Sequence, residues 1–243
     1  MGMEIRAGAE LPFRDLNAAI RDSAEREIRI RECIGQRYIG AGLSDRQIRI
    51  EGTPGNALGA YLNGATIRVS GNAQDATGDT MNGGEIVIEG NSGDATGYAM
   101  RGGRIFVRGD AGYRTGIHMK AYKENHPAIV IGGVCGSFLG EYQAGGTIVV
   151  LGEGAGARPV VGNFCGTGMH GGEMYIRADE LPKRLAPEVK AERLDGLASG
   201  EAQELVAAFC ERFGRSAEDY VKGTWWHLTP NSENPYKQMY VNN

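Results

Sequence analysis

The residues best able to carry nucleophilic or metal chemistry in this chain are four cysteines and four histidines, and their spacing forms no catalytic pattern. No two cysteines make a C-x-x-C pair, so the spacing gives no support for a zinc or iron–sulfur site, and we expect reduced thiols. The histidines follow no H-E-x-x-H spacing, and the chain has no G-x-S-x-G nucleophile motif. The sequence therefore predicts no catalytic, cofactor-binding or metal-binding residue in this chain.

Composition narrows the class of protein further. Glycine accounts for 39 of the 243 residues, about twice its usual share of ~7%. Hydrophobic residues make up 41%, which favours a buried core over disorder, and the net charge of −4 argues against a nucleic-acid-binding surface. No apolar run reaches the ~18 residues that a membrane helix needs, and the first residues lack the layout of a signal peptide. We therefore expect a cytoplasmic protein without membrane contact.

Glycines recur at a fixed interval of 19 residues over much of the chain, and insertions shift the interval at 120–127 and again at 152–165. Glycine is the residue that best tolerates positive φ or close approach of another backbone, so a repeated glycine indicates a repeated corner. The predicted glycine ladder consists of Gly52, Gly71, Gly90, Gly109, Gly133 and Gly152 in one register and Gly59, Gly78, Gly97, Gly116 and Gly140 in another.

Apolar residues keep the same interval, as in Ile48, Ile67, Ile86 and Ile105. Each repeat contains one stretch of alternating apolar residues, which is typical of a strand, and is too short to hold a strand plus a full crossover helix. A period near 20 indicates a stack of repeats, and parallel connections are almost always right-handed. The predicted fold class is an all-β solenoid, a right-handed parallel β-helix of about seven to eight rungs.

The two ends of the chain depart from the repeat. Residues 14–27 place their apolar side chains on one helical face, which predicts an N-terminal cap helix. Residues 200–213 predict a second helix that ends at Gly214, followed by an irregular tail. The predicted organisation is a cap helix in residues 1–27, the repeat in residues 28–178, and a C-terminal helical segment with its tail in residues 179–243.

The outward positions of the predicted strands become apolar toward the later repeats. An outward apolar stripe must be covered, either by the terminal segments of the chain or by a partner protein, and the sequence leaves both open. The residues concerned are Phe106, Val130, Val149 and Tyr175.

The first insertion is basic and carries an aromatic residue. Insertions in repeat proteins map to loops on one side, often the binding side, so a partner contact is one interpretation and a merely tolerated insertion is the other. The candidate contact residues here are His118, Lys120, Tyr122 and Lys123.

Several motifs together resemble the GXGXG domain of glutamate synthase large subunits, over about residues 13–180. The final residues, Leu228-Thr229-Pro230 through Pro235-Tyr236, are similar to the end of the stand-alone, archaeal-type domain 3 protein. The motifs that carry the resemblance are Ile34-Gly35-Gln36-Arg37-Tyr38-Ile39-Gly40, Glu51-Gly52-Thr53-Pro54-Gly55-Asn56, Gly78-Asp79-Thr80-Met81-Asn82-Gly83-Gly84, Gly116-Ile117-His118-Met119-Lys120, Gly132-Gly133 with Phe138-Leu139-Gly140-Glu141-Tyr142, and Gly166-Thr167-Gly168-Met169-His170-Gly171-Gly172.

The resemblance implies a non-catalytic scaffold subunit of a glutamate synthase-type complex, which serves glutamate biosynthesis and ammonia assimilation. Its implied partners are a glutaminase-type amidotransferase subunit and a synthase subunit that holds FMN and an iron–sulfur cluster, with no cofactor in this chain. The alternatives are a β-helix subunit of a related complex, such as N-methylglutamate synthase or formylmethanofuran dehydrogenase, and a stand-alone carbohydrate-active enzyme.

Overall fold

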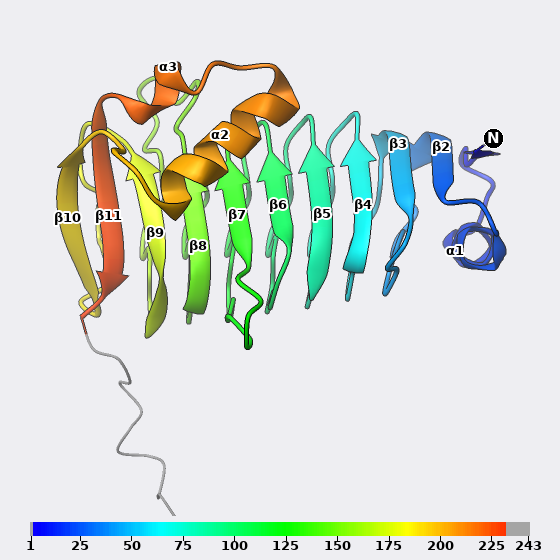
Figure 1. Cartoon of the computed structure of the whole chain (residues 1–243), viewed down its shortest axis with the longest axis horizontal. Helices are drawn as coiled ribbons and strands as arrows, with labels where there is room; N and C mark the ends of the chain where they lie inside the picture. The colour runs from blue at the N-terminus through cyan, green and yellow to red at the C-terminus, as the bar shows by residue number, and fades with distance from the viewer. Residues whose placement is uncertain (1, 232–243) are drawn as a thin grey trace, which may run out of the picture.

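The computed structural model describes residues 2–231. The segment predicted as an irregular tail is in part regular, because Glu218–Val221 form a short helix and Thr224–Pro230 form a strand, and the part of the tail beyond residue 231 lies outside the described range. Strands dominate the described chain, with three helices near its two ends (Figure 1). The helices are α1 (Phe13–Asp22), α2 (Glu201–Phe213) and α3 (Glu218–Val221). The strands are β1 (Met3–Arg6), β2 (Glu27–Ile34), β3 (Gln47–Thr53), β4 (Asn63–Val69), β5 (Gly83–Ile88), β6 (Arg104–Val107), β7 (Ala128–Ile131), β8 (Ala144–Val150), β9 (Gly171–Arg177), β10 (Val189–Asp195) and β11 (Thr224–Pro230).

All of these strands belong to one eleven-stranded sheet, in the order β1-β2-β3-β4-β5-β6-β7-β8-β9-β11-β10. Neighbours from β1 to β9 are parallel and follow the chain order. The chain then reverses, and β11 pairs antiparallel with both β9 and β10. The sheet is therefore mixed, with a long parallel part and a short antiparallel end.

This topology corrects the predicted fold class. The described residues form a single mixed eleven-stranded sheet, not an all-β parallel solenoid of seven to eight rungs. The periodic glycines and apolar residues carry information about the parallel part, but none about the reversal after β9. The predicted N-terminal helical cap is also corrected, because β1 forms the edge of the sheet and pairs with β2, while α1 contributes Leu16 and Ile20 to the main core.

The predicted strand register is confirmed by the pairing of the strands. Ile48 lies beside Ile67, Ile67 beside Ile86, and Ile86 beside Ile105, each step being one 19-residue repeat. After the insertion, Ile105 lies beside Ile129, so the longer loop leaves the pairing intact. Register is fixed in this way because a slip by one residue would turn every buried side chain outward.

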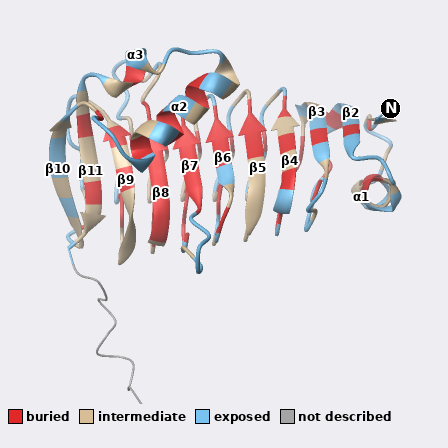
Figure 2. Ribbon diagram, in the orientation of Figure 1, coloured by how far each residue is buried: buried red, intermediate tan, exposed pale blue. Residues whose placement is uncertain are grey.

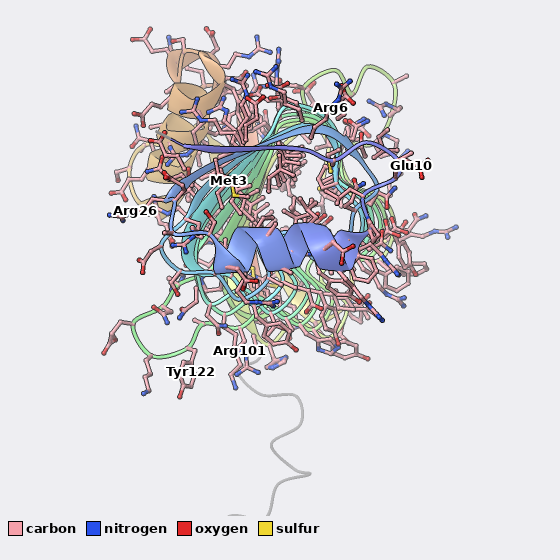
Figure 3. All side chains as sticks on the ribbon, turned by 90° about the vertical axis from the view of Figure 1, so that its right-hand side faces the viewer. Met3, Arg6, Glu10, Arg26, Arg101 and Tyr122 are labelled. Atoms are coloured by element: carbon pink, nitrogen blue, oxygen red, sulfur yellow. The ribbon has the colours of Figure 1, made fainter. Side chains whose placement is uncertain are left out.

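The inner face of the sheet holds the main core. Its isoleucine, valine, leucine and methionine side chains are almost completely buried, and Figure 2 shows that burial is greatest along β6, β7 and β8 and lower toward both ends. Figure 3, turned to look along the row of strands, shows these side chains gathered inside the curved ribbon. Burial of these apolar side chains, which stabilises the fold by about 25 cal/mol per Å² of apolar surface, offsets the conformational entropy that the glycines lose on folding.

The ladder glycines lie where another backbone or side chain comes close. Gly90 has no positive φ, but a Cβ there would collide with the Asn72 side chain and with the carbonyl of Gly71 at 2.8 Å. Gly78 has a φ of +71°, and a Cβ there would collide with the Ile105 side chain. The physical reason for glycine therefore differs between these two positions: it is close approach at Gly90, and left-handed backbone together with packing at Gly78.

Asn and Asp side chains link successive repeats at one corner. Asn72 Oδ1 accepts the backbone N–H of Asn91 at 2.8 Å, and Asn91 Oδ1 accepts that of Asp110 at 2.8 Å. Asp110 Oδ1 continues the series by accepting the N–H of Val134 at 2.9 Å. These side chains act as local substitutes for backbone acceptors, which is a structural role.

Candidate interaction surfaces

The outward apolar stripe is covered by the chain itself. Phe106, Val130 and Val149 are fully buried in a second core cluster, which they share with α2 and with Trp225 of β11. Figure 1 shows α2 lying across the outer side of the strands in the C-terminal half of the sheet. Three of the four stripe residues are therefore inaccessible to a partner, and of the two alternatives that the sequence left open, the structure shows coverage by the chain itself.

Helix α2 is held over the stripe by packing and by one well-formed ion pair. Its Phe209 side chain is fully buried in the same cluster as Phe106. The Arg212 guanidinium lies 4.5 Å from the centre of the Phe106 ring and pairs with Glu85 at 2.6 Å. The predicted end of the helix is confirmed, because Gly214 adopts the left-handed conformation with a φ of 63° and donates its N–H to the carbonyl of Cys210.

Tyr175, the fourth stripe residue, belongs to a polar cluster beside the second core cluster. Its ring stacks on His227 with 4.4 Å between centroids, and its hydroxyl donates to Glu173 at 2.7 Å. The His227 Nε2 atom lies 2.8 Å from the same carboxylate. Burial raises the pKa of Glu173, but the hydrogen bonds from Tyr175 and His227 outweigh it and leave the pKa below its usual range.

Sequence reasoning missed this polar cluster, because His227 and Glu173 are 54 positions apart and meet only through the antiparallel pairing of β11 with β9. Burial and the hydrogen bond to Glu173 raise the pKa of Tyr175. The tyrosine is thus held in its neutral, donating form, and the cluster fastens β11 to β9.

The other predicted contact residues lie on the surface. His118, Lys120, Tyr122 and Lys123 are all exposed, and the insertion that holds the last three is a short loop closed by a bridge between Tyr122 and Asn125. These four residues remain accessible to a partner.

A set of rings surrounds His118 on the surface, and the sequence analysis missed it. His118 stacks on Tyr142 at 5.2 Å with an interplanar angle of 8°, and Tyr98 meets it edge-on at 5.9 Å. Beside them, Phe138 contacts Tyr113 at 5.2 Å. We call this surface the aromatic face, and its residues are Tyr98, Tyr113, Arg114, His118, Phe138, Tyr142 and Phe164. Arg114, Phe138 and Phe164 occupy one position of successive repeats, and His118 and Tyr142 occupy another, a signal that the sequence does contain.

The cysteines are placed as buried hydrophobic residues. All four are free thiols, and burial raises the pKa of Cys33 to about 11 and that of Cys165 to about 12. Burial likewise raises the pKa of Cys210 to about 11 and that of Cys135 higher still. A buried thiol with a raised pKa is a poor nucleophile and a poor metal ligand.

A hollow of about 540 Å³ lies between the second insertion and the segment after β9. Two of the arginines that line it already bind other groups of the chain. Arg158 pairs with the Asp110 carboxylate at 2.9 Å, and Arg177 donates to the carbonyl of Asp219 at 3.3 Å. Asp179 and Glu180 line the same hollow, so the hollow does not strongly favour a ligand of either charge. In residues 2–231 no group of three or more His, Cys, Asp or Glu side chains could hold a metal ion, and no helix is long and apolar enough to cross a membrane.

Comparison with known proteins gives matches of three kinds. A model of the GXGXG motif family matches residues 17–232. An uncharacterized protein of Methanocaldococcus jannaschii is 39% identical over 133 residues, which are 51% of this chain and 50% of that protein. The match thus spans about half the length of the curated relative.

The third match is to a solved structure. A chain in the crystal structure of the formyltransferase/hydrolase complex (FhcABCD) from Methylorubrum extorquens, determined with methylofuran bound, superposes with a TM-score of 0.60 at 25% identity. The superposition covers 83% of this chain and 72% of that chain.

Proposed function

Because the chain belongs to the GXGXG motif family, as its motifs predicted, we propose that it is a non-catalytic subunit of a multi-subunit enzyme complex of the formyltransferase/hydrolase kind. The observation that carries this proposal is the structural likeness, over 83% of the chain, to a chain of such a complex. In this role the protein holds catalytic neighbours in position and supplies no reacting group itself.

The chemistry of the described residues supports a positioning role. The thiols are buried, and burial raises their pKa values, so none is poised as a nucleophile. The exposed part of the aromatic face offers ring surfaces and one guanidinium, which suit binding better than bond making.

A glutamate synthase-type complex is the second candidate, and the motifs around Gln36-Arg37-Tyr38 and Thr53-Pro54-Gly55-Asn56 favour it. In that case the partners would be a glutaminase-type amidotransferase and a synthase subunit, and the FMN and iron–sulfur cluster would belong to the synthase subunit. N-methylglutamate synthase belongs to the same group of candidates.

Co-expression separates the two candidates. The full chain is produced with the subunits of a formyltransferase/hydrolase-type complex, and separately with the amidotransferase and synthase subunits. Size-exclusion chromatography with light scattering then shows which set it joins, and we expect a stoichiometric complex with the first. A chain that joins only the second set would replace the first candidate by the second. A chain that joins neither, or that turns over a substrate alone, would refute the proposal.

A further inference from the structure

The aromatic face is built on backbone positions that do not favour large side chains. In each of several repeats, two turn residues adopt the left-handed conformation, which residues other than Gly, Asn and Asp rarely adopt. Several earlier repeats place alanine there, such as Ala76 and Ala95 in the first of these two columns. In the later repeats the same column holds Arg114, Phe138 and Phe164, with φ of 59°, 62° and 61°.

The second column changes in the same way. Thr80 and Ala99 occupy it in the middle repeats, and His118 and Tyr142 follow with φ of 55° and 54°. Bulky residues therefore replace the small residues of the middle repeats in both columns, while Tyr38 and Tyr61 already hold one position of each column in the first repeats. Because alanine adopts the left-handed conformation here as well, the turn itself requires that conformation, and the bulky side chains are not needed to form the turn.

Burial within the chain accounts for these side chains only in part, because Phe138 and Tyr142 are half-buried while others are exposed. Phe164 is 42% exposed and Tyr98 is 40% exposed, while His118 is also exposed. The rings touch one another, as in the contact between Phe138 and Phe164 at 5.1 Å. Exposed aromatic residues that contact one another are the usual composition of the centre of a protein–protein interface.

The charges around the aromatic face are mainly basic. Arg101, Lys120 and Lys123 are exposed on one side, and Arg184 is exposed on the other, where its carbonyl accepts the N–H of Phe164 at 3.1 Å. Figure 3 shows Arg101 and Tyr122 on the same side of the molecule, both pointing away from the ribbon.

The acidic groups next to the face are mostly engaged. Glu141 is buried and pairs with Arg114 at 2.7 Å. Asp94 accepts the backbone N–H of Tyr113 at 2.8 Å, while Glu124 in the insertion is an exposed carboxylate. The hydrogen bond leaves the charge of Asp94 in place, so Asp94 and Glu124 offset two of the four rim cations, and the remaining positive charge attracts an acidic surface and favours fast association.

We propose that the aromatic face is the docking surface for a catalytic subunit of the complex, and that this subunit presents apolar side chains surrounded by carboxylates. The inference rests on the proposed function, which supplies the partner proteins, and it adds where on this chain one of them binds. The occupant fits both features of the face, since its apolar centre would cover the rings and its carboxylates would meet Arg101, Lys120 and Lys123.

The test combines a double variant with a matched control. Phe138→Ala with Phe164→Ala replaces both rings by the residue that earlier repeats carry in the same column, so the fold is expected to keep its Tm. The control is Tyr61→Ala, because Tyr61 is 58% exposed and also left-handed, with a φ of 58°, but belongs to an earlier repeat away from the aromatic face.

Binding of the co-expressed formyltransferase/hydrolase-type subunits to the immobilised full chain is then measured by interferometry at two salt concentrations. We expect the double variant to raise Kd at least about a hundredfold and the control to leave it within about twofold. Lys120→Glu with Lys123→Glu is expected to slow association and to weaken its dependence on salt.

Three outcomes would overturn the inference. If the wild type binds and the double variant binds equally well, the docking surface lies elsewhere while the proposed function stands. If the wild type binds no subunit of either set, the proposed function fails and the docking inference fails with it. If the chain alone sediments as a dimer that the double variant dissociates, the occupant is a second copy and not a catalytic subunit.

Discussion

Replacing Phe106 by aspartate tests whether α2 covers the outer side of the sheet in solution. Phe106 has no exposed surface and packs with Arg212 and Phe209 of the helix. Truncating a buried phenylalanine costs about 3–5 kcal/mol, and burying a carboxylate adds to this, although the nearby Arg212 would compensate part of the charge. We therefore expect a loss of at least about 4 kcal/mol in the free energy of unfolding.

The assay is thermal unfolding followed by circular dichroism, with urea unfolding as an independent measure. For a chain of this size 1 kcal/mol corresponds to about 2–4 °C, so Tm should fall by at least about 8 °C. Arg49→Asp is the matched control, because Arg49 occupies the equivalent outward position of β3 and is exposed. Its effect should stay within about 0.5 kcal/mol.

An unchanged Tm for Phe106→Asp, together with an unchanged Tm for the control, would refute the assignment. It would mean that α2 does not rest on the stripe in solution and that the stripe is free to meet a partner. A large loss in both variants would instead show that any new charge on the outer side disrupts the sheet.

Three further predictions concern the corner, the thiols and the polar cluster. Gly90→Val should lower the yield of folded protein or reduce the Tm measured by calorimetry by more than about 8 °C, because the valine Cβ would collide with Asn72 and Gly71. A Tm equal to that of the wild type would contradict the close approach of the backbones at this corner. In the folded protein at pH 8, the four thiols should react with an aromatic disulfide reagent at least about a hundredfold more slowly than in the urea-unfolded protein, because burial raises their pKa values. A thiol that reacts fast in the folded protein would contradict its burial. The lowered pKa of Glu173 contributes stability that is present above the ordinary carboxyl pKa of about 4.3 and is lost as pH falls through the lowered value. Tyr175→Phe removes one of the hydrogen bonds that lower this pKa, so the variant's Tm should depend less on pH on the acid side of a Tm–pH profile. A profile identical to that of the wild type would show that the Tyr175 hydrogen bond does not lower the pKa of Glu173.

The parallel part of the sheet was predictable because its signal repeats. An isoleucine every 19 residues, as in Ile48 and Ile67, fixes both the interval between strands and the face that is buried. The reversal at β11 was not predicted, because β11 lies outside the 19-residue repeat and its pairing with β9 depends on where the chain returns after α2.

The candidate surfaces were likewise predictable only where a repeated sequence pattern marks them. The stripe at Phe106 was identified from its period, yet the choice between α2 and a partner depends on where a distant helix packs, which no local pattern encodes. His118 was identified because it adjoins the insertion. Phe138 and Phe164 were missed because their importance lies in backbone conformation, and φ at those positions is apparent only from the fold.

The two outermost strands of the sheet, β1 and β10, run in the same direction and share one further property. On β1, Glu4 and Arg6 are exposed, and on β10 Lys190 and Glu192 are exposed. Free strand edges invite copies of a protein to join end to end, and charged side chains on such edges oppose this. The sheet therefore has protected ends, and its chains are expected to remain separate particles in concentrated solution instead of growing into fibres.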